Sequence, residues 1–409
     1  MFLLDRLFRR IIREGDLRVV DHRGAEYRYG APSERVAPAT FRCTDAATAR
    51  AIARNLALGA GEAFMDGRLI VERGNIADVV NLVTWNVRWD RDNPVRFALW
   101  RQAALAGWLG QFNQAARAKR NVAHHYDLGD RLYDLFLDAD RQYSCAYYTD
   151  PGNSLEQAQA DKLAHIAAKL DLRAGQRVLD IGCGWGGLAL YLHRVAGVDV
   201  TGVTLSVEQH RAATARAAAE GVADHVRFEL IDYRALSGRF DRIVSVGMFE
   251  HVGLPQYRTF FDKVHSLLAD GGVALLHTIA RADGPGATDP FTAKYIFPGG
   301  YAPALSQIVS AIEKSWLWIT DIEVLRLHYA LTLEDWFRRC VAHEAEIVAL
   351  HNARFFRMWL FYLAAAAAAF RNDGHMNVQI QLTRARDALP LTRDYISSAE
   401  TRYREGALG

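Results

Sequence analysis

The feature that most constrains the fold is a glycine-rich turn at residues 182–187, which directly follows a short apolar segment at 178–181. That segment predicts a buried strand, and the apolar residues at 188–195 predict a helix after the turn. A strand, a glycine turn and a helix in this order bring backbone N–H groups close to a nucleotide-like ligand. Glycine is required because a Cβ would block the approach. With Asp180 before the turn, we favour a ligand site over a turn that binds nothing.

An alternation of strands and helices continues from this turn. The predicted strands are 177–181, 199–204, 226–231, 240–246 and 273–279, and the predicted helices between them are 188–195, 207–220 and 257–268. This alternation predicts an α/β fold with a doubly wound, mostly parallel sheet. Ligands of such sheets bind at the carboxyl ends of the strands, so the residues just after each strand are candidate site residues.

The residues on either side of this sheet predict two further parts. Residues 1–113 predict a small α+β docking domain, with helices at 2–14, 46–58 and 76–87, strands at 17–21, 27–30 and 37–42, and turns at 59–74. A basic connector at 114–120 predicts a linker to a catalytic domain at 121–409. Helices with many aromatic residues, including Trp316, Trp318, Trp336 and Trp359, predict a cap around 280–370. Such aromatic residues form either core or the wall of an apolar substrate pocket.

The charge of the chain is unevenly distributed. Residues 1–120 hold 20 Lys and Arg against 13 Asp and Glu, whereas the remainder holds 29 against 34. Such a basic part suits an anionic surface, either lipid headgroups or nucleic acid, unless it is ordinary surface variation. The helix predicted at 2–14 carries arginines opposite bulky apolar residues, which favours an anionic bilayer surface. The alternative is a helix packed on its own domain. We expect no nucleic-acid partner.

Other sequence features limit the location and the chemistry. The longest uncharged apolar run, residues 358–370, is too short to cross a bilayer and predicts a buried helix. The N-terminus lacks the pattern of a signal peptide. The four cysteines form no C-x-x-C pair, so we expect neither a metal site nor a disulfide framework. These features predict a cytoplasmic protein that associates peripherally with the inner membrane surface.

Polar residues follow several of the predicted strands. Glu250 comes after the fourth strand and His277 lies at the end of the fifth. A polar residue at the end of a buried strand is costly unless it is paired or used. Either residue alone could be structural, Glu250 as an acid at a helix N-terminus and His277 as a hydrogen-bonded core histidine. Both at the same edge favour a catalytic site. Asp232 and Tyr233, after the third strand, offer an acceptor and an aromatic plane for an adenine ring.

Several motifs together carry a resemblance to a known family. They are YSCAYY at 143–148, VLDIGCGWGG at 178–187, GVTLS at 202–206, SVGMFEHVG at 245–253, LHTI at 276–279 and KYIFPGG at 294–300. In combination they resemble the bacterial cyclopropane-fatty-acyl-phospholipid synthases, most clearly over residues 120–375. The resemblance implies a class I fold that binds S-adenosylmethionine (SAM).

The resemblance also implies an activity and a site. The family transfers a methylene group from SAM to a cis double bond in an acyl chain of a membrane phospholipid, and a bound bicarbonate ion removes a proton so that the ring closes. The implied bicarbonate pocket consists of Cys145, Glu250, His277, Ile279 and Tyr329. The implied SAM contacts are Tyr143, Ser144, Gly182, Gly184, Thr204, Leu205, Gln209, Asp232 and Tyr233, beside Asp180. A homodimer is expected as well.

The chemistry agrees with these residue types. An alkene is a weak nucleophile, so it requires an electrophile as strong as the sulfonium methyl of SAM. Aromatic faces could stabilise the resulting cation, with Tyr143, Tyr147, Phe249 and Tyr295 as candidates. Cys145 suits a donor rather than a nucleophile, because no activating histidine adjoins it in the sequence. The alternatives are methyl transfer without ring closure, a lipid carrier that binds SAM without turnover, and an N-methyltransferase of small amines.

Overall fold

The computed structural model describes residues 1–89 and 129–406, which belong to two compact units. The first unit consists of the described part of 1–109 together with 286–298 and 330–375. The second consists of the described part of 110–285 together with 299–329 and 376–409. The linker predicted at 114–120 lies outside the described residues. The structure thus groups much of the predicted cap with the N-terminal residues, whereas the sequence places the cap in the catalytic domain.

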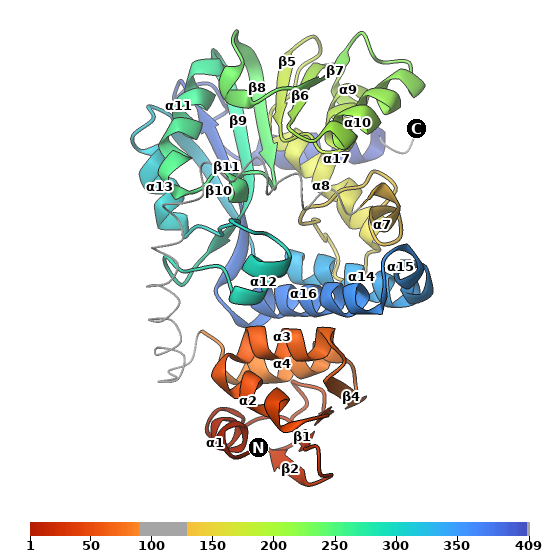
Figure 1. Ribbon diagram of the computed structural model, residues 1–409. Coiled ribbons are helices and arrows are strands. Elements are labelled where there is room, and N and C mark those ends of the chain that lie inside the picture. The colour runs from red at the N-terminus through yellow and green to blue at the C-terminus, as the bar shows by residue number, and fades with distance from the viewer. Residues whose placement is uncertain (90–128, 407–409) are drawn as a thin grey trace. The chain divides into compact units, whose positions relative to one another are not determined.

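The second unit is built around a seven-stranded sheet with the order β10-β11-β9-β8-β5-β6-β7 (Figure 1). Its strands are β5 (Arg177–Ile181), β6 (Asp199–Thr204), β7 (Val226–Leu230), β8 (Phe240–Val246), β9 (Leu268–Arg281), β10 (Trp318–Leu325) and β11 (His375–Thr383). The pairs β5–β6, β5–β8, β6–β7 and β8–β9 are parallel, and β10–β11 is antiparallel. This sheet confirms the predicted α/β class and its mostly parallel strands.

Helices cover both faces of this sheet. The helices of the second unit are α7 (Asp130–Asp134), α8 (Leu155–Lys169), α9 (Gly187–Ala196), α10 (Val207–Ala219), α11 (Tyr257–Leu267), α13 (Leu305–Ile312) and α17 (Asp394–Gly406), with short 3₁₀ turns at η1 (Tyr233–Ala235), η2 (Phe249–His251) and η3 (Leu254–Gln256). Val178 belongs to an apolar cluster with α8, α9, α10 and α17. Its neighbour Leu179 belongs to a second cluster with α11 and α13. Because successive side chains of a strand point to opposite faces, these clusters form the core on the two sides of the sheet.

The first unit combines a small sheet with helices from distant parts of the chain. Its strands are β1 (Leu17–Val20), β2 (Glu26–Tyr29), β3 (Ala39–Cys43) and β4 (Leu69–Arg73), in the order β2-β1-β3-β4. Its helices are α1 (Phe2–Ile11), α2 (Ala46–Arg54), α3 (Leu56–Met65), α4 (Ile76–Asn86), α12 (Pro290–Tyr295), α15 (Glu344–Leu350) and α16 (Ala353–Asn372), and most of α14 (His328–Ala342). Figure 1 shows α16 lying along α3 and α4.

Two local predictions are wrong. Residues 59–74, predicted as turns, form most of α3 and all of β4. Gly61 lies within α3 although glycine disfavours helices. Close packing accounts for it, because an added Cβ would lie 2.4 Å from the ring of Phe291. Trp316 and Trp318, predicted in helices, lie in a turn and at the start of β10, and Trp316 has a φ of +60°. The sequence analysis found neither β10 nor β11.

The N-terminal helix packs mainly within its own unit. Leu4, Phe8 and Ile11 of α1 are buried, and the Phe8 ring contacts Tyr29 edge-on at 5.4 Å between centroids. Phe2 and Leu3, in contrast, are 77% and 55% exposed. Most of the apolar face of α1 is therefore core, and its first turn alone presents apolar side chains to the outside.

Helix α16 contains the apolar run at 358–370. Among the described residues it is the one helix long and apolar enough to cross a membrane by length and composition. In the structure, 56% of its most apolar window is buried. A buried core helix of this length and composition passes the same test, so this finding is weak support for a membrane span.

Candidate active site

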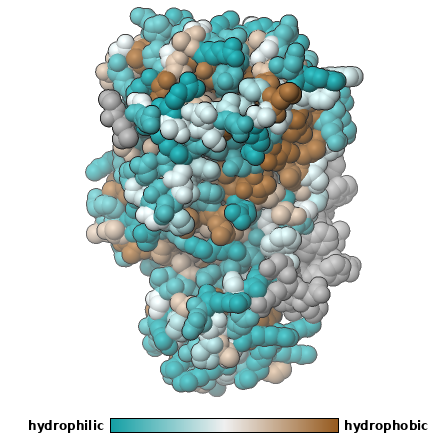
Figure 2. Space-filling model, turned by 180° about the vertical axis from the view of Figure 1, so that it is seen from behind, coloured by the Kyte–Doolittle hydropathy of each residue, from teal (hydrophilic) through white to brown (hydrophobic). Residues whose placement is uncertain are grey.

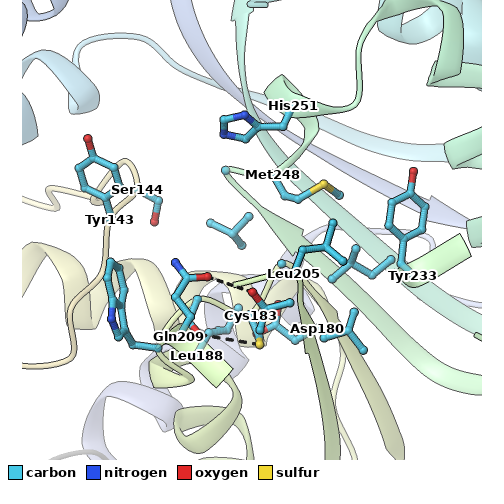
Figure 3. Close-up of a pocket in the computed structure, with 18 of the residues that line it drawn as sticks. Tyr143, Ser144, Asp180, Cys183, Leu188, Leu205, Gln209, Tyr233, Met248 and His251 are labelled. Carbon is cyan, nitrogen blue, oxygen red and sulfur yellow. Dashed lines mark hydrogen bonds between the residues drawn. The ribbon is translucent and has the colours of Figure 1, made fainter. Parts of the chain in front are cut away.

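A cavity of about 300 Å³ lies at the carboxyl ends of β5, β6 and β8. The ten residues predicted to contact the methyl donor all line it: Tyr143, Ser144, Asp180, Gly182, Gly184, Thr204, Leu205, Gln209, Asp232 and Tyr233. Figure 3 shows Tyr143 and Ser144 on one side of the cavity and Tyr233 on the opposite side. The structure therefore brings together residues from four separate segments at the edge where ligands of parallel sheets bind.

The glycine turn presents its backbone to this cavity. Gly182 has a φ of +84°, and a Cβ at that position would lie 2.8 Å from Cβ of Met248. The N–H groups of Gly182 and Cys183 both donate to the carbonyl of Val203, at 2.9 and 3.1 Å. Helix α9 begins directly after the turn, so its N-terminus is directed at the same edge. Residues other than glycine would strain or fill this turn. Glycine therefore leaves room for the close approach of a nucleotide-like ligand.

Polar side chains of the cavity are held by hydrogen bonds. The Thr204 hydroxyl donates to Oε1 of Gln209 at 3.0 Å and accepts from the N–H of Ser206 at 3.1 Å. Asp232 accepts from the backbone N–H and from Nε of Arg234, each at 3.0 Å. These contacts fix the orientation of the threonine, the amide and the carboxylate before any ligand binds.

Asp180 is the most unusual polar group of the cavity. Its side chain is 2% exposed, and Oδ2 has no hydrogen-bond partner among the described residues. Burial raises the pKa of Asp180 to about 7, and the positive charge of Lys162 partly opposes the shift. A buried carboxyl oxygen without a partner is costly. The donor groups of SAM would supply that partner, so the residues present fit this methyl donor.

A second group of predicted residues is buried close to the cavity. Glu250 lies in η2, after β8, and the N–H of Ile279 on β9 donates to its Oε1 at 2.7 Å. Glu250 Oε2 is buried and has no hydrogen-bond partner among the described residues. Burial raises the pKa of Glu250, and the bond from Ile279 opposes the shift. The carboxyl group thus has one fixed oxygen and one oxygen available to a proton donor.

His277 is held at both ring nitrogens. It is 1% exposed, with Nε2 3.0 Å from Nδ2 of Asn377 and Nδ1 3.1 Å from Nε2 of Gln379. A neutral imidazole has one donor and one acceptor nitrogen, so one of the two amides must face it with oxygen instead. Burial lowers the pKa of His277 to about 3. His277 is therefore a neutral ring whose position is fixed by two side chains of β11.

Cys145 and Tyr329 lie on segments that are joined to each other. The thiol of Cys145 is fully buried, donates to the carbonyl of Ala146 at 3.3 Å, and has a pKa raised by burial. Tyr329 is 8% exposed in the first turn of α14. The N–H of Tyr148 donates to Nδ1 of His328 at 2.9 Å, which fastens the segment after Cys145 to the residue before Tyr329.

The five predicted bicarbonate ligands do not themselves line the cavity. Their neighbours do: Ser144 precedes Cys145, and His251 follows Glu250. The two groups of site residues are thus adjacent in sequence but differ in exposure to the cavity. Across residues 1–89 and 129–406, there is no group of three or more His, Cys, Asp or Glu that could hold a metal ion.

The sequence analysis assigned no role to several residues at this site. His251 lines the cavity, and burial lowers its pKa to about 4. Gln159, Lys162, His165 and Lys169 form a buried polar face on α8. Their spacing of three and four residues was a signal for one helix face, although it could not indicate that this face is turned inward.

Comparison with known proteins identifies the family. The family model for mycolic acid cyclopropane synthetase matches residues 113–380. A cyclopropane-fatty-acyl-phospholipid synthase of Escherichia coli is 40% identical over 337 residues, which are 82% of this chain and 85% of that protein. A probable fatty acid methyltransferase of Pseudomonas putida is 43% identical over 257 residues, which are 61% of this chain and 65% of that protein.

A solved structure supports the same assignment. The mycolic acid cyclopropane synthase CmaA1, complexed with SAH and CTAB, is 32% identical with a TM-score of 0.61 and covers 64% of this chain and 97% of that chain. The family model covers more than half of the chain, and the match to the E. coli synthase extends over most of both proteins. The chain therefore belongs to the mycolic acid cyclopropane synthetase family and is a SAM-dependent methyltransferase of the cyclopropane-fatty-acyl-phospholipid synthase type.

Proposed function

We propose that this enzyme transfers a methylene group from SAM to a cis double bond in an unsaturated phospholipid acyl chain and thereby forms a cyclopropane ring. The observation that carries the proposal is the arrangement of two adjacent groups of residues. One group lines a cavity suited to the methyl donor. The other, around Glu250 and His277, is buried and suited to removing a proton away from water.

The cavity residues would bind and orient SAM, which supplies an electrophilic methyl group. Asp180 offers a carboxyl oxygen without a partner, and Thr204 and Gln209 offer polar groups already held by each other. Tyr233 offers an aromatic plane, and its ring is held edge-on against Phe260 at 5.5 Å between centroids. Preformed polar and aromatic groups reduce the ordering that binding requires.

The acyl chain would react in surroundings that exclude water. Addition of the methyl group to one alkene carbon leaves positive charge on the other, and water would intercept that charge. Of the aromatic candidates, Phe249 is fully buried and stacked on Tyr257, and both faces of Tyr147 are stacked between His165 and His328. Tyr143 lines the cavity, so we propose that its ring stabilises the cation.

Ring closure requires loss of a proton from the transferred methyl group to a base. We propose that bicarbonate, when bound, supplies this base. Oε2 of Glu250 would accept the hydroxyl of the ion, and the thiol of Cys145 would exchange its hydrogen bond to the carbonyl of Ala146 for one to the ion. The raised pKa of Glu250 reduces the repulsion between two anions. We assign to His277 the role of a fixed neutral ring and to Tyr329 that of a further pocket donor.

A phospholipid substrate lies in a bilayer, so we propose that the enzyme acts at a membrane surface. Phe2 and Leu3 are exposed at the start of α1, and Arg6 and Arg10 are exposed on the same helix. An apolar tip with basic neighbours suits the interface of an anionic bilayer. Figure 2 also shows a broad hydrophobic patch on one face of the molecule. We extend the proposal to the cytoplasmic surface of the inner membrane and to a homodimer, for which the family resemblance is the support.

A second candidate is methyl transfer to an unsaturated acyl chain without ring closure. The observation that favours it is the likeness to the P. putida protein, which is named a probable fatty acid methyltransferase. Both reactions use the same cavity and the same carbocation chemistry. Ring closure takes a proton from the transferred methyl group, whereas methyl transfer without ring closure does not. The Glu250 group, as the proposed site of this proton loss, is therefore the part of the site in which the two reactions differ.

Product analysis tests these candidates. The enzyme is incubated with SAM and vesicles of phospholipid with cis-unsaturated chains, and the acyl chains are examined by mass spectrometry before and after hydrogenation. We expect chains that gain one CH₂ unit and resist mild hydrogenation. Chains that gain CH₂ but take up hydrogen would contradict ring formation. Binding of SAM without any product would instead favour a lipid carrier.

A further inference from the structure

Lys162 of α8 is a charged residue in the interior of the second unit. Its side chain is fully buried, and its Nζ donates to Oε1 of Gln142 at 2.5 Å and to Oγ of Ser144 at 3.0 Å. Both acceptors line the cavity, on either side of Tyr143 in the sequence. Burying an ammonium group is costly, so its two hydrogen bonds to the cavity wall call for a functional explanation.

A neighbouring side chain of α8 holds the same segment through its backbone. Nε2 of Gln159 donates to the carbonyls of Gln142 and Ser144, at 3.2 and 3.0 Å. The N–H of Gln142 donates in turn to Oδ1 of Asp138 at 2.8 Å. Helix α8 therefore fixes residues 142–144 by one charged and one neutral side chain, which lie one turn apart.

Carboxyl groups lie around Lys162. Asp138 and Asp140 from the preceding segment and Asp180 from β5 favour its charged form, and Lys162 acts on His277 of β9. Burial lowers the pKa of Lys162 to about 8 although the carboxylates raise it. The ammonium form therefore loses its proton within a pH range in which binding can be measured.

We propose that Lys162 is a positioning residue for the methyl donor, which fixes Gln142 and Ser144 and with them the wall of the cavity that Tyr143 completes. The inference rests on the proposed binding of SAM in this cavity. Cys145 directly follows Ser144, so the same attachment also sets the start of the buried thiol segment. Lys162 itself does not line the cavity and is not expected to touch the reacting atoms.

The test is the affinity of the full-length protein for SAM as a function of pH. Lys162→Met keeps the length of the side chain and removes its charge. Calorimetry on the wild type and on the variant, from well below to well above pH 8, gives the ratio of their dissociation constants. We expect the variant to bind about tenfold more weakly below pH 8, since hydrogen bonds from charged groups are the stronger ones. The ratio should shrink above pH 8, because the wild type then loses its ammonium proton.

Titration of SAM itself affects both proteins equally and cancels in the ratio. Asp180 titrates in the same range and is acted on by Lys162, so the ratio is measured again in the Asp180→Asn background, where that titration is absent. Gln159→Met is the matched control, because it removes two neutral hydrogen bonds to the same segment and should weaken binding by a factor independent of pH. If Lys162→Met does not fold, Ser144→Ala removes one acceptor of the ammonium, and its ratio should shrink above pH 8 in the same way.

Two results would overturn different conclusions. A Lys162→Met ratio that stays constant across the pH range, or that equals one throughout, contradicts the positioning role and leaves SAM binding intact. A wild-type protein that does not bind SAM at any pH contradicts the proposed function itself.

Discussion

The cavity proposed for the methyl donor and the group around Glu250 and His277 lie at the same sheet but differ in their surroundings. The cavity opens at the strand ends and is lined by glycine backbone and by side chains already held by each other. The Glu250 group does not line this cavity: Cys145 and His277 are almost fully removed from water, and Oε2 of Glu250 is buried. Binding the donor favours an open, preformed shape, whereas transfer of a proton favours dry groups with shifted pKa values.

The largest effect that we expect comes from Glu250→Gln. The amide keeps the size of the side chain and an oxygen for the N–H of Ile279, but it cannot act as a carboxylate. Turnover should fall by about a hundredfold or more, the usual contribution of acid–base catalysis. The affinity for SAM should remain that of the wild type, because Glu250 does not line the cavity. Turnover is measured on lipid vesicles and affinity by calorimetry. Unchanged turnover, or an equal loss of both, would remove the distinction between the two regions.

Asp180→Asn tests the other region, the cavity proposed to bind the methyl donor. The pKa of Asp180 is raised to about 7, so the carboxyl is neutral below pH 7 and charged above it. The cationic donor should therefore bind the wild type more tightly as the pH rises through 7, whereas the Asn variant should lack this rise. Above pH 7 we expect the variant to bind about tenfold more weakly, the scale of a hydrogen bond to a charged group.

Turnover at saturating SAM is the control measurement for Asp180→Asn. With SAM at saturation, the Asn variant should recover most of its turnover, in contrast to Glu250→Gln. Identical pH profiles of the two dissociation constants would show that Asp180 does not face the donor.

Gln379→Leu tests how His277 is held. The substitution leaves one ring nitrogen of a buried histidine without its amide partner. An unsatisfied buried polar group costs about 1–3 kcal/mol, so the free energy of unfolding should fall by that amount. Chemical denaturation of both proteins measures this change. Stability equal to that of the wild type would mean that His277 does not depend on Gln379.

Arg6→Gln is expected to have the smallest effect. Arg6 is exposed beside the apolar tip of α1, and one basic residue near an anionic bilayer contributes about 1 kcal/mol to binding. Binding to vesicles with anionic lipid should weaken about fivefold, and the affinity for SAM should not change. Arg28→Gln removes an exposed charge on β2 and serves as the control. Equal effects of the two substitutions would indicate a general charge effect instead of a docking helix.

The sequence predicted the cavity better than the buried group. The family resemblance implied nine of the ten residues that line one cavity, and strand ends by themselves indicated only those after β5, β6 and β7, where parallel strands bring their carboxyl ends together. The amides that hold His277 were missed because β11 was not predicted: Asn377, Gln379 and Gln381 alternate with apolar residues as in a strand with one exposed face, yet both faces are buried. The role of Lys162 was missed because periodicity shows which residues share a helix face but not where that face points.

The most direct test of the central claim uses SAM with a fully deuterated methyl group. The wild-type enzyme is incubated with this donor and cis-unsaturated phospholipid, and the deuterium in the acyl products is measured by mass spectrometry. Ring closure removes one deuteron from the transferred methyl group, so we expect products that retain two deuterium atoms and resist hydrogenation. Products that retain all three would show that the proton is lost from the acyl chain, which would contradict the proposed role of the Glu250 group.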